Sequence, residues 1–414
     1  MANTLKFGAG QWATKEGSTL AYNDENNNFK PLPFNFERGS SATVVNKDGL
    51  IETVGSGQPR IDYKDDSEGA LLLEPQRTNL ITYSSDFSDA SWSKTGASAT
   101  SGFTSPDGTT NAFKLVEGTN NGIHQLKAIG INTVVDRYNF SVFVKPNGRN
   151  EIRIVGTNYF SSGTDAYFNL ETKVIIYGAK AENGLIETLA NGWFRCSFSS
   201  SGGEFAGNNA HMNIETALNN SNYYQGDGTS GVYIYGAMLE QQSYATSYIP
   251  TEGATNTRLQ DIANNSGNST LINSTEGVLY AEIAALANGG DNRQISISDG
   301  TNDNVVILRL DLSDTSITSF VRGNAGSYAI KTITGITKVN NNKIALAWNA
   351  TNLRIWINGV ESGSAAVNDL PIGLSKINFS SAAINSSFFF GKTKAVAVYK
   401  EALTNAQLQS LTTI

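Results

Sequence analysis

Short apolar runs with a two-residue period recur along most of this chain, and such runs predict β-strands. Residues 139–146 (NFSVFVKP) and 151–156 (EIRIVG) each place their apolar side chains on one face: Phe140, Val142 and Val144 in the first run, Ile152 and Ile154 in the second. Between the runs, Asn147-Gly148 predicts a tight reversal, because Asn and Gly tolerate the positive φ angles of hairpin turns.

The stretch from Val174 to Ser199 repeats this arrangement. Asn183-Gly184 and Asn191-Gly192 each separate two strand-like runs, so we expect three strands in a meander. Stretches with a helical period are absent from this part of the chain. The pattern favours an antiparallel sandwich over an α/β fold.

Residues 277–414 predict a second sandwich that ends in a short helix. In LRIWINGVE the Asn358-Gly359 pair predicts a hairpin, with Trp356 on the face opposite Ile355 and Ile357. At the end of the chain, Thr404 and Gln407 have the spacing of a capping box. The sequence therefore predicts an all-β protein with two antiparallel β-sandwich (jelly-roll) domains in tandem and a C-terminal helix.

The remaining segments are short of core-forming residues. Residues 1–69 contain only short apolar pieces, too few to enclose a core of their own. We expect this region to pack on the next domain, on a neighbouring subunit or on a larger particle. Residues 262–276 are rich in Asn and Ser and predict a linker. The expected domains are thus 1–69, 70–261 and 277–414, with the linker 262–276.

The composition excludes several classes of function. The net charge is −7 and no basic stripe is present, so a phosphate backbone would be repelled and nucleic-acid binding is not expected. No apolar run approaches the roughly twenty residues of a membrane span, so no membrane insertion is expected. The single cysteine, Cys196, permits no intrachain disulfide, and the N-terminus lacks the apolar core of a signal peptide. These features suit folding in a reducing cytoplasm.

Two segments resemble signatures of appendage proteins of tailed bacteriophages. Residues 70–88 (ALLLEPQRTNLITYSSDFS) and 231–250 (GVYIYGAMLEQQSYATSYIP) each run from an apolar strand into an acid, Glu74 or Glu240, and on to a polar segment. In those proteins the two signatures frame a jelly roll similar to carbohydrate-binding modules. The resemblance implies a virion structural protein made in the host cytoplasm and displayed on the virion surface.

The C-terminal domain resembles a second family. LRIWINGV followed by AVYKEALTNAQLQSL is similar to the last strands of concanavalin A-like and laminin-G-like lectin domains. Those domains end in a strand, a turn and a small helix. The resemblance implies a lectin-type sandwich here.

No residue pattern predicts catalysis or a metal site. His124 and His211 have no partners at a recognisable spacing, and no Walker loop, HExxH or GxSxG motif is present. The acid string E-x-D-x-x-E of concanavalin A-like glycosidases is absent as well, although two carboxylates brought together by the fold would permit glycan cleavage. Asp227, Asp299 and Asp303 lie in oxygen-rich loops that suit structural calcium, but Asp-Gly is also a common turn pair, and the turn is the simpler interpretation.

Sugar binding by a sandwich depends on exposed aromatic rings, which stack on the C–H face of a pyranose. The candidates in loops or at strand ends are Tyr223, Tyr224, Tyr159 and Trp92. Tyr223 and Tyr224 are the preferred pair, because they are adjacent rings beside Asn and Asp groups. For each ring the alternative is packing under its own loop.

The preferred hypothesis is a non-enzymatic fibre or decoration subunit of the virion that binds host-surface or environmental glycans. Trp12, Phe34 and Phe36 are the candidate residues for attachment to capsid or tail proteins; alternatively, Trp12 folds back on its own chain. Because residues 1–69 lack a core, we expect a homotrimer or homodimer. The alternatives are a polysaccharide depolymerase and a spacer that binds nothing.

Overall fold

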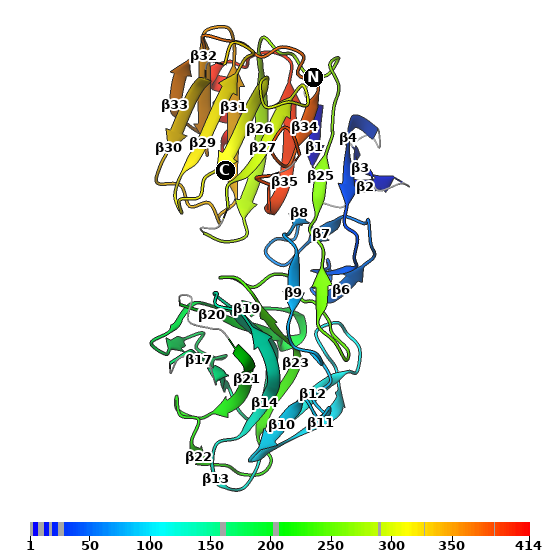
Figure 1. The fold of residues 1–414 in the computed structure, drawn as a ribbon, viewed down its shortest axis with the longest axis vertical. Helices are drawn as coiled ribbons and strands as arrows, with labels where there is room; N and C mark the ends of the chain where they lie inside the picture. Colours follow the sequence, from blue (N-terminus) through cyan, green and yellow to red (C-terminus); the bar gives the residue numbers. More distant parts are fainter. Residues whose placement is uncertain are drawn as a thin grey trace. The chain divides into compact units, whose positions relative to one another are not determined.

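The computed structural model describes residues 3–6, 12–15, 19–23, 29–157, 163–201, 207–288, 291–326, 328–384 and 386–414. The chain is built almost entirely of β-strands (Figure 1), which confirms the predicted fold class. It forms two compact units: unit 1 contains residues 1–41, 54–75 and 260–414, and unit 2 contains residues 42–53 and 76–259.

Unit 2 is a sandwich of two antiparallel six-stranded sheets. The first, the β14–β21 sheet, has the order β10 (Trp92–Thr95), β14 (Gln125–Thr133), β21 (Gly207–Ala217), β16 (Glu151–Thr157), β17 (Asp165–Asn169) and β18 (Ile175–Tyr177). The second, the β15–β23 sheet, has the order β11 (Ala97–Phe103), β12 (Ala112–Glu117), β23 (Gly231–Glu240), β15 (Asn139–Asn147), β20 (Phe194–Ser200) and β19 (Ala181–Thr188).

Smaller elements surround these sheets. They are the strand pairs β5 (Ala42–Val45) with β6 (Ile51–Val54), β9 (Arg77–Asn79) with β24 (Asn256–Arg258) and β13 (Asn121–Gly122) with β22 (Tyr224–Gln225), and the 3-10 turn η1 (Ala190–Gly192).

The core of unit 2 lies between its two sheets, as the two-residue period predicts. Phe140, Val142 and Val144 of β15 face Ile152 and Ile154 of β16 in one apolar cluster. Cys196 is buried in the same cluster, where burial raises the pKa of its thiol, so it packs as a small apolar side chain.

One predicted turn is a bulge. The reversal at Asn191-Gly192 is present, but β19 continues through Asn183-Gly184, and its register with β20 shifts between Glu182 and Leu185. Asn183 has a φ of 53°. A positive φ serves a β-bulge as well as a hairpin, so the residue pair alone does not distinguish the two.

Unit 1 is a second sandwich. Its larger sheet, the β26–β35 sheet, has the order β33 (Val360–Ala366), β32 (Asn352–Ile357), β31 (Asn342–Trp348), β26 (Gly277–Ala285), β35 (Gly391–Tyr399), β8 (Ala70–Leu73) and β7 (Arg60–Asp62), and β1 (Asn3–Lys6) also pairs with β35. The five-stranded sheet has the order β30 (Tyr328–Ile333), β29 (Ile317–Arg322), β28 (Val305–Leu310), β27 (Arg293–Ser298) and β34 (Lys376–Asn378). A third sheet contains β2 (Trp12–Lys15), β3 (Thr19–Asn23), β4 (Phe29–Glu37) and β25 (Ile262–Asn264).

Residues 29–41 and 54–75 are part of this C-terminal sandwich, whereas the sequence predicted that residues 1–69 form a region of their own that packs on the following domain, a neighbouring subunit or a larger particle. Figure 1 shows the blue strand β4 beside the green strand β25, and β8 pairs with the red strand β35. The core of unit 1 includes Phe34, Phe36 and Ile61 from the N-terminal region, and Leu71 and Leu73 from the segment that was predicted to begin the 70–261 sandwich. Residues 29–41 and 54–75 lack a core of their own because most of their buried large apolar side chains complete the core of residues 260–414, and residues 42–53 belong to unit 2.

This arrangement corrects two assignments. Phe34 and Phe36 are 0% and 1% exposed, so they fill their own chain's core and present no ring for attachment to another protein. Residues 262–276 do not form a free linker, because β25 pairs with β4 and Ile272 is buried in the core. Because residues 29–41 and 54–75 belong to unit 1 and contribute to its core, a missing core no longer favours an oligomer, and a dimer or trimer stays a prediction.

Four buried charged residues join the distant segments of unit 1. Asp261 accepts from Arg38 Nη1 at 3.0 Å and from Arg60 Nη2 at 2.5 Å, and Arg60 Nη1 donates to Glu74 at 2.7 Å. The side chains of Arg38, Arg60 and Asp261 are 0% exposed. We call this set the buried charge network; it connects residues 38, 60 and 74 to the start of the C-terminal segment.

The C-terminal helix α1 (Asn405–Thr412) covers the outer face of the β26–β35 sheet. The predicted capping box is present. The Thr404 hydroxyl accepts from the backbone N–H of Gln407, and the Gln407 side-chain oxygen accepts from the backbone N–H of Thr404. Leu408 packs with Trp356, while Ile355 and Ile357 lie in the core on the other face, as predicted.

Candidate functional site

The preferred aromatic pair is split between the interior and the surface. Tyr223 is 62% exposed, whereas Tyr224 is 8% exposed. Tyr224 begins β22, and successive side chains of an extended segment point to opposite sides. The two rings therefore cannot form one stacking platform, and Tyr224 is corrected from a ligand contact to a structural residue.

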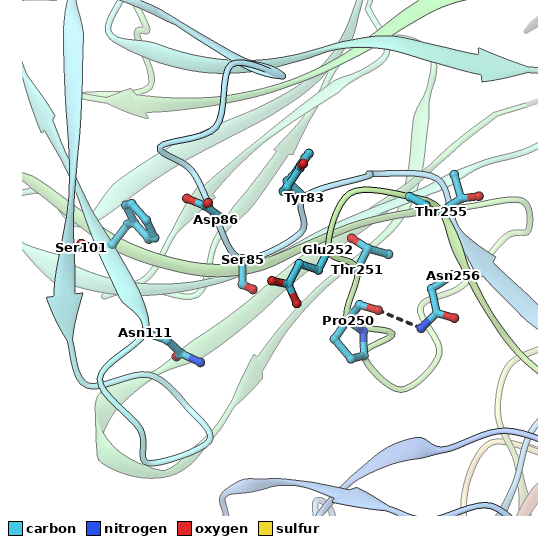
Figure 2. A pocket seen from close by; sticks show the side chains of 12 residues that line it. Tyr83, Ser85, Asp86, Ser101, Asn111, Pro250, Thr251, Glu252, Thr255 and Asn256 are labelled. Atoms are coloured by element: carbon cyan, nitrogen blue, oxygen red, sulfur yellow. Dashed lines mark hydrogen bonds between the residues drawn. The ribbon is translucent and has the colours of Figure 1, made fainter.

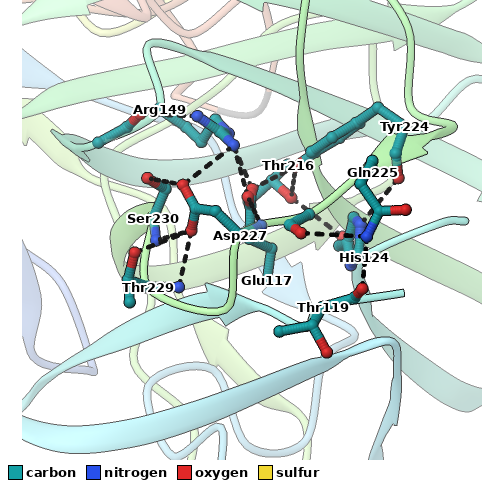
Figure 3. A network of polar contacts seen from close by, with 12 residues as sticks. Glu117, Thr119, His124, Arg149, Thr216, Tyr224, Gln225, Asp227, Thr229 and Ser230 are labelled. Carbon is teal, nitrogen blue, oxygen red and sulfur yellow. Dashed lines mark hydrogen bonds and ion pairs between the residues drawn. The ribbon is translucent and has the colours of Figure 1, made fainter. Parts of the chain in front are cut away.

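Tyr224 belongs to a buried polar network that includes Glu117 and Arg149 (Figure 3). Its hydroxyl donates to Glu117 Oε2 at 2.7 Å and lies 2.7 Å from the Thr216 hydroxyl, and the Arg149 guanidinium lies 5.5 Å from its ring centroid. Burial, followed by the Glu117 carboxylate, raises the pKa of Tyr224 to about 12. The ring is consequently a neutral hydrogen-bond donor at physiological pH.

Glu117 holds the next loop in place. It accepts from Arg149 Nε at 2.8 Å and from the backbone N–H of Asp227 at 2.9 Å. Asp227 in turn accepts from the backbone N–H groups of Thr229 and Ser230, both at 2.7 Å, and these bonds lower its pKa. The network fixes the segment from Tyr224 to Ser230, and its carboxylates are already occupied by the protein's own donors.

A second group of polar side chains lies on the outer face of the β14–β21 sheet. The exposed Tyr223 is next in sequence to Asn222, which bonds to this group. Gln125, Glu215, Arg153 and Tyr167 lie opposite one another on the adjacent strands β14, β21, β16 and β17. We call these four residues the polar row. Their sequence neighbours Leu126, Ile214 and Ile154 point into the core, which places the row on the outside of the sandwich.

Hydrogen bonds order the polar row. Arg153 donates to Glu215 at 3.2 Å and to Asp165 at 2.9 Å, and its guanidinium lies 5.1 Å from the Tyr167 ring centroid. Asn222 donates to Glu215 at 2.8 Å and accepts from the Tyr167 hydroxyl at 3.4 Å. Glu215 is only 2% exposed, and its hydrogen bonds to Arg153 and Asn222 hold the side chains of the polar row in one arrangement.

Burial and neighbouring charges shift the pKa values of three side chains on this face. Burial alone would lower the pKa of Arg153, but its hydrogen bond to Asp165 and the charge of Glu215 raise it overall. Burial also raises the pKa of Tyr167, and burial together with Lys127 lowers the pKa of His211. The polar row and its partner Asp165 therefore combine the Arg153 guanidinium with acidic, phenol and amide groups.

These groups suit a polyhydroxylated ligand. Guanidinium and amide N–H groups donate to sugar hydroxyls, amide and carboxylate oxygens accept from them, and the rings of Tyr167 and Tyr223 offer apolar faces. Sequence reasoning missed the polar row. The sequence pattern that could have indicated it lies in EIRIVG and HMNIETA, where Arg153 and Glu215 alternate with apolar residues and so point to the opposite face of the strand.

The other predicted aromatic residues are placed differently. Trp92 is 2% exposed in the core of unit 2, and its indole N–H donates to the carbonyl of Tyr83 at 2.7 Å, so it is corrected to a structural residue. The Trp12 side chain and Tyr159 lie outside the described residues.

No metal cluster is found in the part of the chain that the structure describes. Asp299 accepts from the backbone N–H of Thr301 at 2.8 Å within its own turn, and Asp303 pairs with Arg322 at 3.0 Å. Both acids therefore support the turn interpretation. The described helices include none with the length and apolarity needed to cross a membrane.

Comparison with known families identifies the C-terminal fold. Residues 261–409 match the family model of the concanavalin A-like lectin/glucanases superfamily. The match extends from just before β25 to within α1, so the C-terminal segment of unit 1 is a concanavalin A-like sandwich, as the sequence predicted.

Several solved structures are similar to parts of this chain. One is the CBM40 of the Ruminococcus gnavus IT-sialidase bound to α2,3-sialyllactose (13% identity, TM-score 0.31, 36% of this chain and 93% of that chain). Others are the heptameric SAP-like pentraxin of Limulus polyphemus (14%, 0.26, 33% and 69%) and domains LG4-5 of the mouse laminin α1 chain (10%, 0.23, 69% and 89%). A search of curated proteins found no match.

Proposed function

We propose that this protein is a non-catalytic, glycan-binding subunit of a tailed-phage virion appendage. The observation that carries the glycan-binding part is the polar row, an ordered set of hydrogen-bonding side chains that includes Tyr167 on the outer face of a sandwich; its partner Asn222 precedes the exposed Tyr223. The lectin-type family match of residues 261–409 supports the same class of function.

Tyr167→Ala and Tyr223→Ala should each weaken binding of the chain to host-surface polysaccharide about fivefold, because a lost stacking contact costs about 1 kcal/mol. Glycan arrays would identify the ligand, and titration calorimetry would measure the affinity of each variant. Tyr328→Ala is the matched control, since Tyr328 is 52% exposed and lies in unit 1. Unchanged affinity in both unit 2 variants, or an equal loss in the control, would contradict the proposal.

A reducing-sugar assay on the bound polysaccharide separates the proposed function from depolymerase activity. Binding without release of reducing ends is expected. Steady release would favour an enzyme.

The phage assignment is supported by the resemblance of residues 70–88 and 231–250 to appendage signatures. Antibodies against the chain should label the surface of purified particles of the phage whose genome encodes it, in negative-stain electron microscopy. Pre-immune serum is the control. Detection of the chain in the infected-cell lysate but not on purified particles would overturn the assignment.

A further inference from the structure

A cavity of about 750 Å³ lies in unit 2, away from the polar row. Three segments line it: Tyr83–Asp86, the β11–β12 region with Ser101, Asn111 and Phe113, and residues 250–256. Its volume falls within the range of roughly 300–1,000 Å³ of small-ligand sites. The polar row contributes no residue to its lining.

The walls of this cavity are held by the two signature segments. The Thr251 hydroxyl donates to the carbonyl of Ile81 at 2.6 Å, and the Ser84 hydroxyl accepts from the Thr251 N–H at 2.9 Å and lies 2.7 Å from the Tyr248 hydroxyl. Ser84 and Thr251 are 0% and 7% exposed, so these bonds lie in the protein interior. The cavity is therefore preorganised where the residue 70–88 and 231–250 signatures meet.

The lining combines apolar surface with hydrogen-bonding groups. Tyr83, Phe113, Pro250 and Ala254 provide apolar surface, and Ser85, Ser101, Asn111, Thr255 and Asn256 provide hydroxyls and amides. Figure 2 shows the Glu252 carboxylate extending from the 250–256 segment toward the side where Ser85 and Asp86 lie. A mixture of apolar surface with a few hydrogen-bonding groups is typical of small-ligand sites.

The charged side chains that line the cavity are all acidic. Asp86 and Glu252 are its carboxylates, and no lysine, arginine or histidine lines the cavity. The backbone N–H of Ser88 donates to Asp86 Oδ1 at 3.0 Å. Within the described residues, Asp86 Oδ2 and the Glu252 carboxylate have no hydrogen-bond partner, so both can accept from ligand hydroxyls. An anionic ligand would meet repulsion that no cation in the lining offsets.

We infer that this cavity is a second sugar site, which takes an uncharged pyranose and rejects an acidic one. The inference rests on the proposed glycan-binding function but uses a separate surface. Asp86 and Glu252 accept hydrogen bonds from hydroxyl groups of the sugar, and their charge excludes uronic acids.

The test uses the full chain and calorimetric titration with neutral tetrasaccharides of glucose, galactose and mannose, each compared with its counterpart oxidised at C6 to the uronic acid. At least one neutral probe should bind. Glu252→Ala should weaken it threefold or more. Ser101→Trp, which places a large ring on the exposed rim, should abolish the binding while leaving the thermal unfolding of the chain unchanged.

Removing charge without removing volume tests the selectivity. The double variant Asp86→Asn, Glu252→Gln should bind the acidic counterpart at least threefold more tightly than the native chain does. Asp303→Asn, which removes a charge in unit 1, is the matched control and should change neither affinity.

The results separate this inference from the proposed function. Loss of all sugar binding in Tyr167→Ala, with no effect of Ser101→Trp, would overturn the second site and leave the polar row as the binding surface. Sensitivity to Ser101→Trp without sensitivity to Tyr167→Ala would support the cavity and contradict the polar row. Failure of every neutral probe to bind, or an acidic preference in the native chain, would also overturn the inference.

Discussion

A fragment that begins at residue 261, where the concanavalin A-like match starts, should fail to fold on its own. It lacks Phe34, Phe36, Ile61, Leu71 and Leu73, which are all buried in the core of unit 1. Loss of a large buried apolar side chain costs about 2–5 kcal/mol, so losing five costs about 10–25 kcal/mol, which is as large as or larger than the roughly 5–15 kcal/mol by which native proteins are stable. The fragment also exposes the edge of β35 that pairs with β8.

Near-ultraviolet circular dichroism and binding of a hydrophobic dye would measure this result. We expect weak aromatic signals and strong dye binding for residues 261–414, compared with the full chain. Addition of a peptide covering residues 54–75, which contains β7 and β8, should reduce the dye binding. A cooperative unfolding transition of the fragment alone, at the temperature seen for the full chain, would show that the N-terminal strands are dispensable.

Asp261→Ala should destabilise unit 1 by about 3–5 kcal/mol, the typical cost of removing one partner of a buried ion pair. Arg38 and Arg60 both direct N–H groups at this carboxylate, and both lie fully inside the protein. Asp261→Asn should cost a similar amount, because a neutral amide cannot balance two guanidinium charges. Urea unfolding followed by tryptophan fluorescence would report it through Trp348 and Trp356, which are buried in unit 1.

The matched control for this variant is Asp303→Asn. Asp303 also pairs with an arginine, Arg322, at 3.0 Å, but its side chain is 61% exposed. Exposed ion pairs contribute about 0–1 kcal/mol, so this change should be nearly silent. Equal destabilisation by both variants would mean that burial of the charge network contributes nothing beyond an ordinary surface pair.

The buried charge network also explains part of the first signature. Glu74 of LLLEPQRTNL binds Arg60 inside unit 1. Asn79 of the same motif donates to the carbonyls of Ala237 and Ile249, which both lie in the second signature, residues 231–250. The signature residues thus stabilise the fold and shape the cavity walls, and the polar row lies elsewhere.

The sequence alone determined the local elements. Alternation of apolar residues was sufficient for β15 and β16, and the Thr404–Gln407 spacing was sufficient for the cap of α1. These features depend on residues close together in the chain, where the geometry of the backbone leaves few options.

Only the tertiary structure decided which segments share a core and which aromatic rings reach the surface. Phe34 and Phe36 pack with strands that lie more than two hundred residues later, Trp92 lies in a core cluster with strands from along the whole of unit 2, and Tyr224 bonds to Glu117. The polar row exists because strands β14, β21, β16 and β17 pair in an order that differs from the chain order. Burial and cross-strand pairing are sums over such long-range contacts, and no local pattern of residues specifies them.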